Sequence, residues 1–405
     1  MNKKLLYWSW FIVFVCHCND VKVSVIKISE ILLLVYGLLH FPHFHKIPKM
    51  LFSLFTLFLA VSLFHNLFLS FDTSVVLSVL QKPYWCSIGR YIEFFCCVTF
   101  IDIIIGVLSK YGLSASINVI LKVNERFCLL ILGLYILEYF HVFESADVIT
   151  ESGRLSGFFN EGGPFGLMIS LFIVLSYVFK RSFMEFAVLV LCLLLSFSKA
   201  GLLLLMLTIL FCMYRRFQGS KRFKVVMSLL LVMTLVMVGY GAYLLAYQYS
   251  ASWMDADATL FYATENPDDY NFTAGRVSGM YIGTEMVKKN FLIGIGLGNY
   301  PILRNMTEYR GFFPPIPVYD SMSLGGVADL LVQQGILGVI LFAWFLKFCY
   351  TRSERGVFIL LFVAVLMCGV QMTFVYPWIL IALNEYIFKI KKTGVSKVKL
   401  LNLSY

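Results

Sequence analysis

The chain of 405 residues is 60% hydrophobic, 17% aromatic and only 14% charged, with a mean hydropathy of +0.82. Soluble proteins contain about 45–50% apolar residues, so this composition excludes a soluble globular protein and indicates a polytopic membrane protein. The net charge of +10 would suggest a nucleic-acid partner in a soluble protein. In a membrane protein the placement of the cations matters more than their number, and we expect no nucleic-acid partner.

Apolar segments follow one another along most of the chain. The first comes after Lys3 and Lys4 and resembles a signal peptide, but no small-residue cleavage site follows Val15, which indicates a retained first span. Several segments are shorter than the roughly 20 residues of a perpendicular span, so flanking residues must contribute. We predict an all-α integral membrane protein with about 12 transmembrane helices, near residues 5–18, 25–41, 50–69, 88–108, 127–143, 165–179, 183–197, 200–214, 225–247, 327–350, 356–374 and 375–388.

The positive charges between these segments predict the orientation, because cytoplasmic loops carry an excess of Lys and Arg. If the N-terminus is cytoplasmic, the clustered cations fall in cytoplasmic connections, whereas the two longest polar loops face the periplasm. Both termini are then cytoplasmic, because the number of spans is even. The clustered cations are Lys46 and Lys49; Lys110, Lys122 and Arg126; Lys180 and Arg181; Arg215, Arg216, Lys221, Arg222 and Lys224; Arg352 and Arg355; and Lys389, Lys391, Lys392, Lys397 and Lys399.

This topology divides the chain into three parts. Residues 1–248 form helices 1–9 with a smaller periplasmic loop near 144–164, residues 249–323 form one large periplasmic loop between helices 9 and 10, and residues 324–405 form helices 10–12 and a basic cytoplasmic tail. Most cysteines lie within or beside spans and the large loop has none. We therefore expect neither disulfides nor a metal site.

Acidic residues inside the predicted spans are costly at membrane depth. They indicate either a proton relay or pairs that stabilise the helix bundle, and the sequence leaves both interpretations open. These residues are Glu30, Glu93, Asp102, Glu138, Glu185, Asp329 and Glu385.

Two periplasmic stretches carry an arginine close to glycines. In the first, Gly153-Arg154-Leu-Ser-Gly-Phe-Phe-Asn-Glu-Gly-Gly-Pro164 leads into a span, and Pro164 suits the first turn of its helix. In the second, Thr273 can cap a short amphipathic helix with Arg276 in its first turn, where backbone N–H groups and the helix dipole favour an anion. Arg276 is therefore a candidate phosphate ligand, and an arginine that anchors a loop at the headgroup level is the alternative. The apolar face predicted for this helix consists of Val277, Met280, Tyr281, Thr284 and Val287.

The second stretch continues into the Gly-rich run Gly294-Ile-Gly-Leu-Gly298. No strand precedes the run and no helix with a distal acid follows it, which excludes a dinucleotide fingerprint. We interpret the run as a turn that returns the chain to the membrane.

In this order, the stretches resemble the O-antigen polymerase and O-antigen ligase superfamily of bacterial envelope glycan assembly. The motifs are Arg154-Leu-Ser-Gly-Phe-Phe-Asn with the following Gly-Pro-Phe-Gly, Gly275-Arg276 leading to Phe291-Leu-Ile-Gly-Ile-Gly-Leu-Gly-Asn-Tyr, and Val327-Ala-Asp-Leu-Leu-Val-Gln-Gln-Gly335. The resemblance implies a multi-pass enzyme of the bacterial inner membrane that uses a polyprenyl-pyrophosphate-linked oligosaccharide at the periplasmic face, without a cofactor or metal. It also implies that Arg154 and Arg276 bind the pyrophosphate. Besides membrane lipid, a chain-length regulator is a further candidate partner.

The ligase branch of the superfamily usually shows a histidine just before the tenth span, whereas this chain has no histidine after His141. This departure favours a polymerase, which transfers a growing chain from its polyprenyl pyrophosphate onto a new lipid-linked repeat. Asp320 is the first candidate for the general base and Glu161 the second, and a solvated carboxylate without a role is the alternative for each. The alternative functions are an O-antigen ligase and a flippase or transporter of the lipid-linked oligosaccharide. The halves of the chain show no internal repeat, which disfavours the transporter.

Overall fold

The computed structural model describes residues 2–23, 26–69, 82–142, 148–150, 153–179, 181–216, 265, 276–311, 313, 325–352 and 356–392. The chain divides into two compact units. Unit 1 comprises Met1–Ser53, Ile92–Arg215 and Trp344–Tyr405, and unit 2 comprises Leu54–Tyr91 and Arg216–Ala343.

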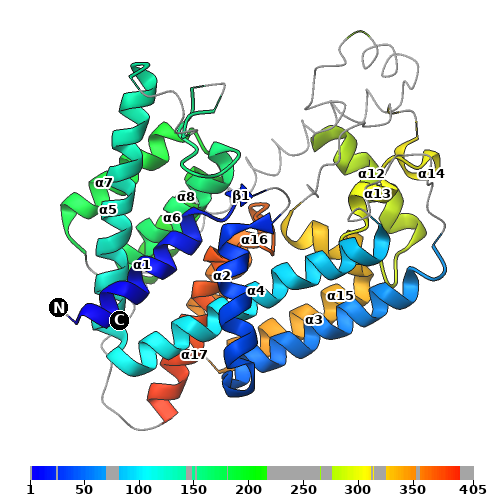
Figure 1. Ribbon diagram of the computed structural model, residues 1–405, viewed down its shortest axis with the longest axis horizontal. Helices are drawn as coiled ribbons and strands as arrows, with labels where there is room; N and C mark the ends of the chain where they lie inside the picture. Colours follow the sequence, from blue (N-terminus) through cyan, green and yellow to red (C-terminus); the bar gives the residue numbers. More distant parts are fainter. Residues whose placement is uncertain are drawn as a thin grey trace. The chain divides into compact units, whose positions relative to one another are not determined.

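The described part of the chain is mainly helical, with one pair of two-residue strands and one isolated β-bridge (Figure 1). These strands, β1 (Lys22–Val23) and β2 (Ile26–Lys27), pair antiparallel directly before α2. The longer helices are α1 (Lys3–His17), α2 (Ile28–His40), α3 (Lys46–His65), α4 (Pro83–Tyr111), α5 (Leu113–Tyr139), α6 (Gly162–Val178), α7 (Phe183–Leu195), α8 (Lys199–Arg216), α12 (Arg276–Lys289), α15 (Gly326–Thr351), α16 (Val357–Met367) and α17 (Ile379–Lys392). The short ones are η1 (Phe41–His43), α13 (Tyr300–Leu303), α14 (Thr307–Arg310) and η3 (Tyr376–Trp378).

The helix α6 lies in the core of unit 1. Nearly all of its side chains are buried, and a helix that is apolar on every side is typical of a position surrounded by other helices. Gly166 allows α8 to approach closely, because a Cβ atom at this position would lie 2.2 Å from the Cβ atom of Ser198. Ser170 Oγ donates a hydrogen bond to the carbonyl oxygen of Gly201 at 2.7 Å. The N-terminal halves of α6 and α8 are therefore held together.

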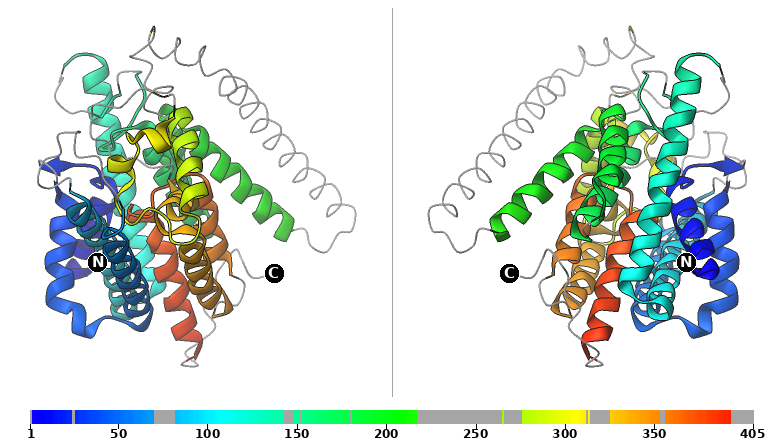
Figure 2. Two further views of the ribbon diagram at one scale, coloured as in Figure 1. Left: turned by 90° about the vertical axis from the view of Figure 1, so that its right-hand side faces the viewer. Right: turned by 90° about the vertical axis from the view of Figure 1, so that its left-hand side faces the viewer.

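Three described helices are long and apolar enough to cross a membrane: α3, α4 and α15. Shorter apolar helices cover residues 28–43, 162–178, 183–195, 199–209 and 357–367. Figure 2 shows α16 and α17, in orange and red, side by side within unit 1. The apolar helices support a membrane-embedded protein, while the number of spans and their orientation stay predictions.

Every predicted span except 225–247, which lies outside the described residues, overlaps a helix of the structure. One boundary was wrong: the predicted connection around 109–126 is almost entirely helical, because α4 continues to Tyr111 and α5 begins at Leu113. Lys and Arg are good helix formers, so α5 includes Lys122 and Arg126 although they lie outside the apolar window. The predicted tenth span is also interrupted, since the backbone of α15 leaves the helical conformation at Gly335.

In unit 2, the helices α12, α13 and α14 share a small hydrophobic core. The predicted helix after Thr273 is confirmed as α12, and its predicted apolar face is confirmed in part, because Tyr281 and Val287 pack against this core. Ile282 and Met286 are buried, whereas Met280 is 42% exposed. The buried face also includes Gly279, where the missing side chain permits close packing. The core residues are Ile282, Met286, Ile295, Tyr300, Leu303, Tyr309 and Val332.

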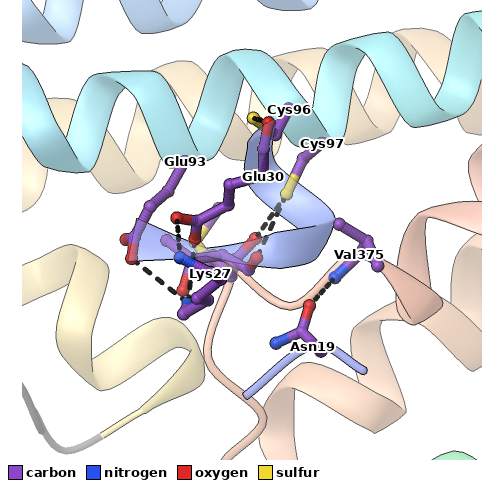
Figure 3. Close-up of polar contacts among 9 residues, drawn as sticks. Asn19, Lys27, Glu30, Glu93, Cys96, Cys97 and Val375 are labelled. Carbon is purple, nitrogen blue, oxygen red and sulfur yellow. Dashed lines mark hydrogen bonds and ion pairs between the residues drawn. The ribbon is translucent and has the colours of Figure 1, made fainter. Parts of the chain in front are cut away.

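The acidic residues predicted inside spans all have polar partners. Lys27 Nζ lies 3.1 Å from Glu30 Oε1 and 3.2 Å from Glu93 Oε1, which joins the start of α2 to α4 (Figure 3). Cys96 Sγ donates to the carbonyl oxygen of Glu30 at 3.4 Å in the same place. These contacts favour bundle-stabilising pairs over a continuous proton relay. The other partners are His45 for Asp102, the Val148 N–H for Glu138, Arg181 and Ser176 for Glu185, Gln333 for Asp329, and Arg352 for Glu385.

Candidate functional site

The loop between α5 and α6 presents Arg154 from a tight turn. Ile149 and Leu155 form an isolated antiparallel bridge, and the backbone N–H of Thr150 donates to the carbonyl oxygen of Arg154 at 2.9 Å. Gly153 has a φ of 76°, a conformation that glycine adopts without strain. The Thr150 hydroxyl accepts from the Arg154 N–H at 3.2 Å. The backbone of Arg154 is therefore fixed by contacts that do not involve its side chain.

The guanidinium group of Arg154 is held by two main-chain carbonyls. Nε donates to the carbonyl oxygen of Ser196 at 3.2 Å, and Nη2 donates to that of Phe197 at 3.3 Å. Both acceptors follow the end of α7, where helix carbonyls lack intrahelical partners and the helix dipole favours a cation. Phe197 has a φ of 47°, which turns the chain sharply from α7 into α8. The turn thus provides a neutral cradle for a permanently charged group.

No carboxylate of the described residues forms an ion pair with Arg154. Within the same part of the chain, its Nη1 atom makes no hydrogen bond, and the side chain is half-buried. Carbonyl oxygens hold a guanidinium in position but do not neutralise it. The charge of Arg154 is therefore available to an incoming anion.

Two helices begin next to this arginine. A Cβ atom on Gly162, the first residue of α6, would lie 3.6 Å from Arg154 Nε. Ser198 caps α8, because its Oγ accepts from the Gly201 N–H at 3.1 Å, and it donates to the carbonyl oxygen of Gly163 at 3.0 Å. Helix N-termini favour anions through their unpaired N–H groups and their dipoles. Both N-termini therefore add to the positive potential at Arg154.

Lys199 is an exposed cation at the N-terminus of α8. The sequence interpretation missed it as a site residue. It is the first residue of α8 and directly follows the cap Ser198. The signal was present, because Lys199 is a cation in the very short predicted periplasmic turn between spans 7 and 8, against the positive-inside trend.

Glu161, the second candidate for the general base, precedes α6. It occupies the N-cap position in an extended conformation (φ −138°, ψ 151°), and its side chain does not cap the helix. The side chain is exposed. The structure thus places Glu161 one residue before Gly162, at the same end of α6 as Arg154.

The structure does not place the other two predicted site residues, Arg276 and Asp320, with Arg154 and Glu161. Arg276 is the first residue of α12 and belongs to unit 2. The predicted position at a helix N-terminus is therefore confirmed for its backbone. Asp320 lies outside the described residues.

Within unit 2, the break in α15 is paired with the segment that follows α12. Gly335 has a φ of 61° and a ψ of −167°. The N–H groups of Ile336 and Leu337 donate to the carbonyl oxygens of Phe291 and Leu292 at 2.9 and 3.2 Å. In return, the Ile295 N–H donates to the carbonyl oxygen of Val332 at 3.0 Å. Non-helical backbone at membrane depth is tolerated only where other protein groups make hydrogen bonds with its N–H and C=O groups. The hydrogen bonds between α15 and the segment after α12 meet this requirement.

The Gly-rich run after Phe291 is fixed by buried polar side chains. The Gly298 N–H donates to Gln333 Oε1 at 2.8 Å, and the Leu297 N–H donates to Ser62 Oγ at 2.9 Å. Ser87 Oγ donates to the carbonyl oxygen of Leu297 at 2.8 Å. A Cβ atom at Gly298 would lie 2.5 Å from the carbonyl oxygen of Cys86, so glycine is required for this approach. The run is a packed turn, as the sequence predicted.

The O-antigen ligase family model matches residues 185–343 of the chain. No curated protein matches it. The matched residues include Lys199, the start of α12 and the broken part of α15, while Arg154 precedes them. The match agrees with the sequence motifs and supports a membrane glycosyltransferase-like enzyme of surface polysaccharide assembly. It thus supports the O-antigen polymerase and ligase superfamily for this chain, without separating polymerase from ligase.

Proposed function

We propose that the protein polymerises polyprenyl-pyrophosphate-linked oligosaccharide repeats into O-antigen or a related surface polysaccharide. The reaction takes place at the periplasmic face of the inner membrane. The observation that carries the proposal is the guanidinium of Arg154, which two carbonyls hold in place and which has no carboxylate partner among the described residues. Such a group suits a pyrophosphate that gains negative charge as it leaves.

In the proposed reaction, a hydroxyl of the new lipid-linked repeat attacks the anomeric carbon of the growing chain. A glycosidic bond forms, the bond between this carbon and the pyrophosphate oxygen breaks, and the polyprenyl pyrophosphate leaves with the electron pair. The hydroxyl proton passes to a carboxylate, for which Asp320 is the first candidate and Glu161 the second. The guanidinium of Arg154 stabilises the charge of the leaving pyrophosphate. Removal of one donor that stabilises charge in this way typically lowers a rate by about 10²–10³-fold.

Arg154, Lys199 and the N-termini of α6 and α8 form one proposed pyrophosphate site in unit 1. Arginine offers two parallel N–H donors to a phosphate, and Lys199 adds a point charge. Arg276 at the start of α12 is the proposed second arginine of the reaction. Its place in the mechanism rests on the sequence resemblance and on its position in the first turn of a helix.

An O-antigen ligase, which transfers finished polymer to the lipid A core, is the second candidate function. The family model that matches residues 185–343 is described by this activity, and this observation favours it. The absence of any histidine after His141 supports the polymerase.

A strain without the gene, complemented with variants, separates these functions. We expect surface lipopolysaccharide of the deletion strain to collapse to core plus one repeat, and Arg154→Ala to reproduce this pattern although the variant is inserted normally. Arg126→Ala, which changes an exposed arginine of α5, is the matched control and should restore the full ladder.

Long chains that accumulate on the polyprenyl carrier would instead identify a ligase. Single repeats trapped at the cytoplasmic face would identify a flippase. A full ladder in Arg154→Ala would exclude the proposed role of this arginine.

A further inference from the structure

An apolar groove of about 440 Å³ runs between α1 and α2, which are blue in Figure 1. The groove is largely open rather than enclosed. Trp8 and Tyr36 line it and contact each other edge to face, with ring centroids 5.8 Å apart. The lining is almost entirely apolar and includes Tyr7, Trp8, Phe11, Val35, Tyr36 and Leu39.

The rim of the groove is an exposed apolar surface. Tyr7 is 68% exposed, Val35 54% and Leu39 71%, and Leu38 beside them is 66% exposed. A contiguous apolar surface of this kind marks contact with a membrane or another apolar partner. In a membrane-embedded chain, the contact along these helices is with acyl chains.

Exposed cations begin the helices that flank the groove. Lys3 and Lys4 begin α1 and are exposed, and Lys46 and Lys49, also exposed, begin α3 directly after α2. Lys49 Nζ donates to the carbonyl oxygen of Pro42 at 2.8 Å, which holds this cation at the end of α2.

The carboxylate that approaches the end of α2 is already hydrogen-bonded. His40 stacks on Tyr36 of the groove with ring centroids 4.1 Å apart. The sequence contains no acidic residue in 1–19 or 31–71. Asp102 reaches this end from α4, but it accepts from both the backbone N–H and Nδ1 of His45 at 2.7 Å. The apolar groove is therefore flanked by helix starts that carry cations.

We propose that this groove binds an anionic phospholipid, with an acyl chain between α1 and α2 and its phosphate near Lys3, Lys4, Lys46 and Lys49. The predicted orientation places these lysines at the cytoplasmic leaflet, where anionic lipids attract basic residues. The pyrophosphate of the lipid-linked sugar belongs to the opposite face in the same orientation. A phospholipid therefore fits the groove better than the substrate does, and the proposal does not depend on the proposed reaction.

Native mass spectrometry of the purified full-length protein tests the proposal. Phosphatidylglycerol and phosphatidylcholine are titrated separately, and the retained lipid is counted. Val35→Trp fills the groove from an exposed position, and Leu38→Trp adds the same bulk on the same helix outside the lining. A third variant replaces Lys3, Lys4, Lys46 and Lys49 by glutamine. All four side chains are exposed, so we expect this variant to fold.

We expect wild type and Leu38→Trp to retain phosphatidylglycerol in preference to phosphatidylcholine. Val35→Trp should lose this retention. The lysine variant should lose more than about tenfold in affinity, because each lysine near an anionic headgroup contributes roughly fivefold. Equal retention of the two lipids by the wild type would overturn the proposal, as would unchanged phosphatidylglycerol retention in either Val35→Trp or the lysine variant.

Discussion

Arg154 donates from Nε to the carbonyl oxygen of Ser196 at 3.2 Å, across 42 residues of sequence. The contact joins the loop before α6 to the turn between α7 and α8. It also explains why this turn needs an unusual backbone: the φ of 47° at Phe197 directs a second carbonyl toward the same guanidinium. An arginine held in this way keeps its charge and loses little entropy when an anion binds.

Lys199→Met should lower the polymerisation rate of membrane vesicles by about 10²-fold, because it removes a cation at the N-terminus of α8 beside Arg154. Lys199→Arg should keep most of the activity, since the charge is retained. The rate is measured by incorporation of labelled lipid-linked repeats. Lys122→Met, which changes an exposed lysine of α5, is the control. Equal rates in Lys199→Met and Lys122→Met would remove Lys199 from the site.

Glu161→Gln and Asp320→Asn identify the general base. A base must be deprotonated to accept the hydroxyl proton, so the wild-type rate should fall at low pH. We expect the variant that removes the base to lose about 10²–10⁴-fold in rate and also to lose this acidic decline. The pH dependence of polymer synthesis is the measurement. If both variants keep the wild-type profile, neither carboxylate is the base.

Gly335→Ala should destabilise the protein by at least about 1–3 kcal/mol, because the conformation at this position is essentially restricted to glycine. The added Cβ atom would also lie 2.4 Å from the carbonyl oxygen of Leu292, whose position the break itself requires. Thermal unfolding in detergent measures the loss. Gly106→Ala is the control, since a Cβ atom there has open space. An unfolding temperature equal to that of wild type would show that the break in α15 is not needed for stability.

Lys27→Met should cost about 3–5 kcal/mol of stability, because it leaves Glu30 and Glu93 without the cation that lies between them. The additional change Glu93→Gln should recover part of the loss by removing one of the two acidic groups beside the missing cation. Both variants are compared by thermal unfolding in detergent. No recovery in the double variant would mean that the cluster does not act through charge compensation.

The sequence by itself indicated the class of protein and the positions of most helices, and its motifs agree with the family match over residues 185–343. Apolar composition and the spacing of charges are local properties, and α1 to α8, α15, α16 and α17 follow from them, although the predicted connection around 109–126 is almost entirely helical. The same local signals identified Arg154 and Arg276 as cations near glycines. The predicted face of α12 was only partly right, because several faces of that helix carry apolar residues and only packing selects one.

The tertiary structure alone decided how these residues are used. Arg154 is fixed by carbonyls 42 and 43 residues away, and Lys199 follows two residues after the second of them, while Gly166 and Gly201 let α6 and α8 meet. The break at Gly335 persists because Phe291 and Leu292 accept the N–H groups that the helix leaves unpaired. Hydrogen bonds over such distances depend on the packing of several helices at once, and a local sequence pattern does not contain that information.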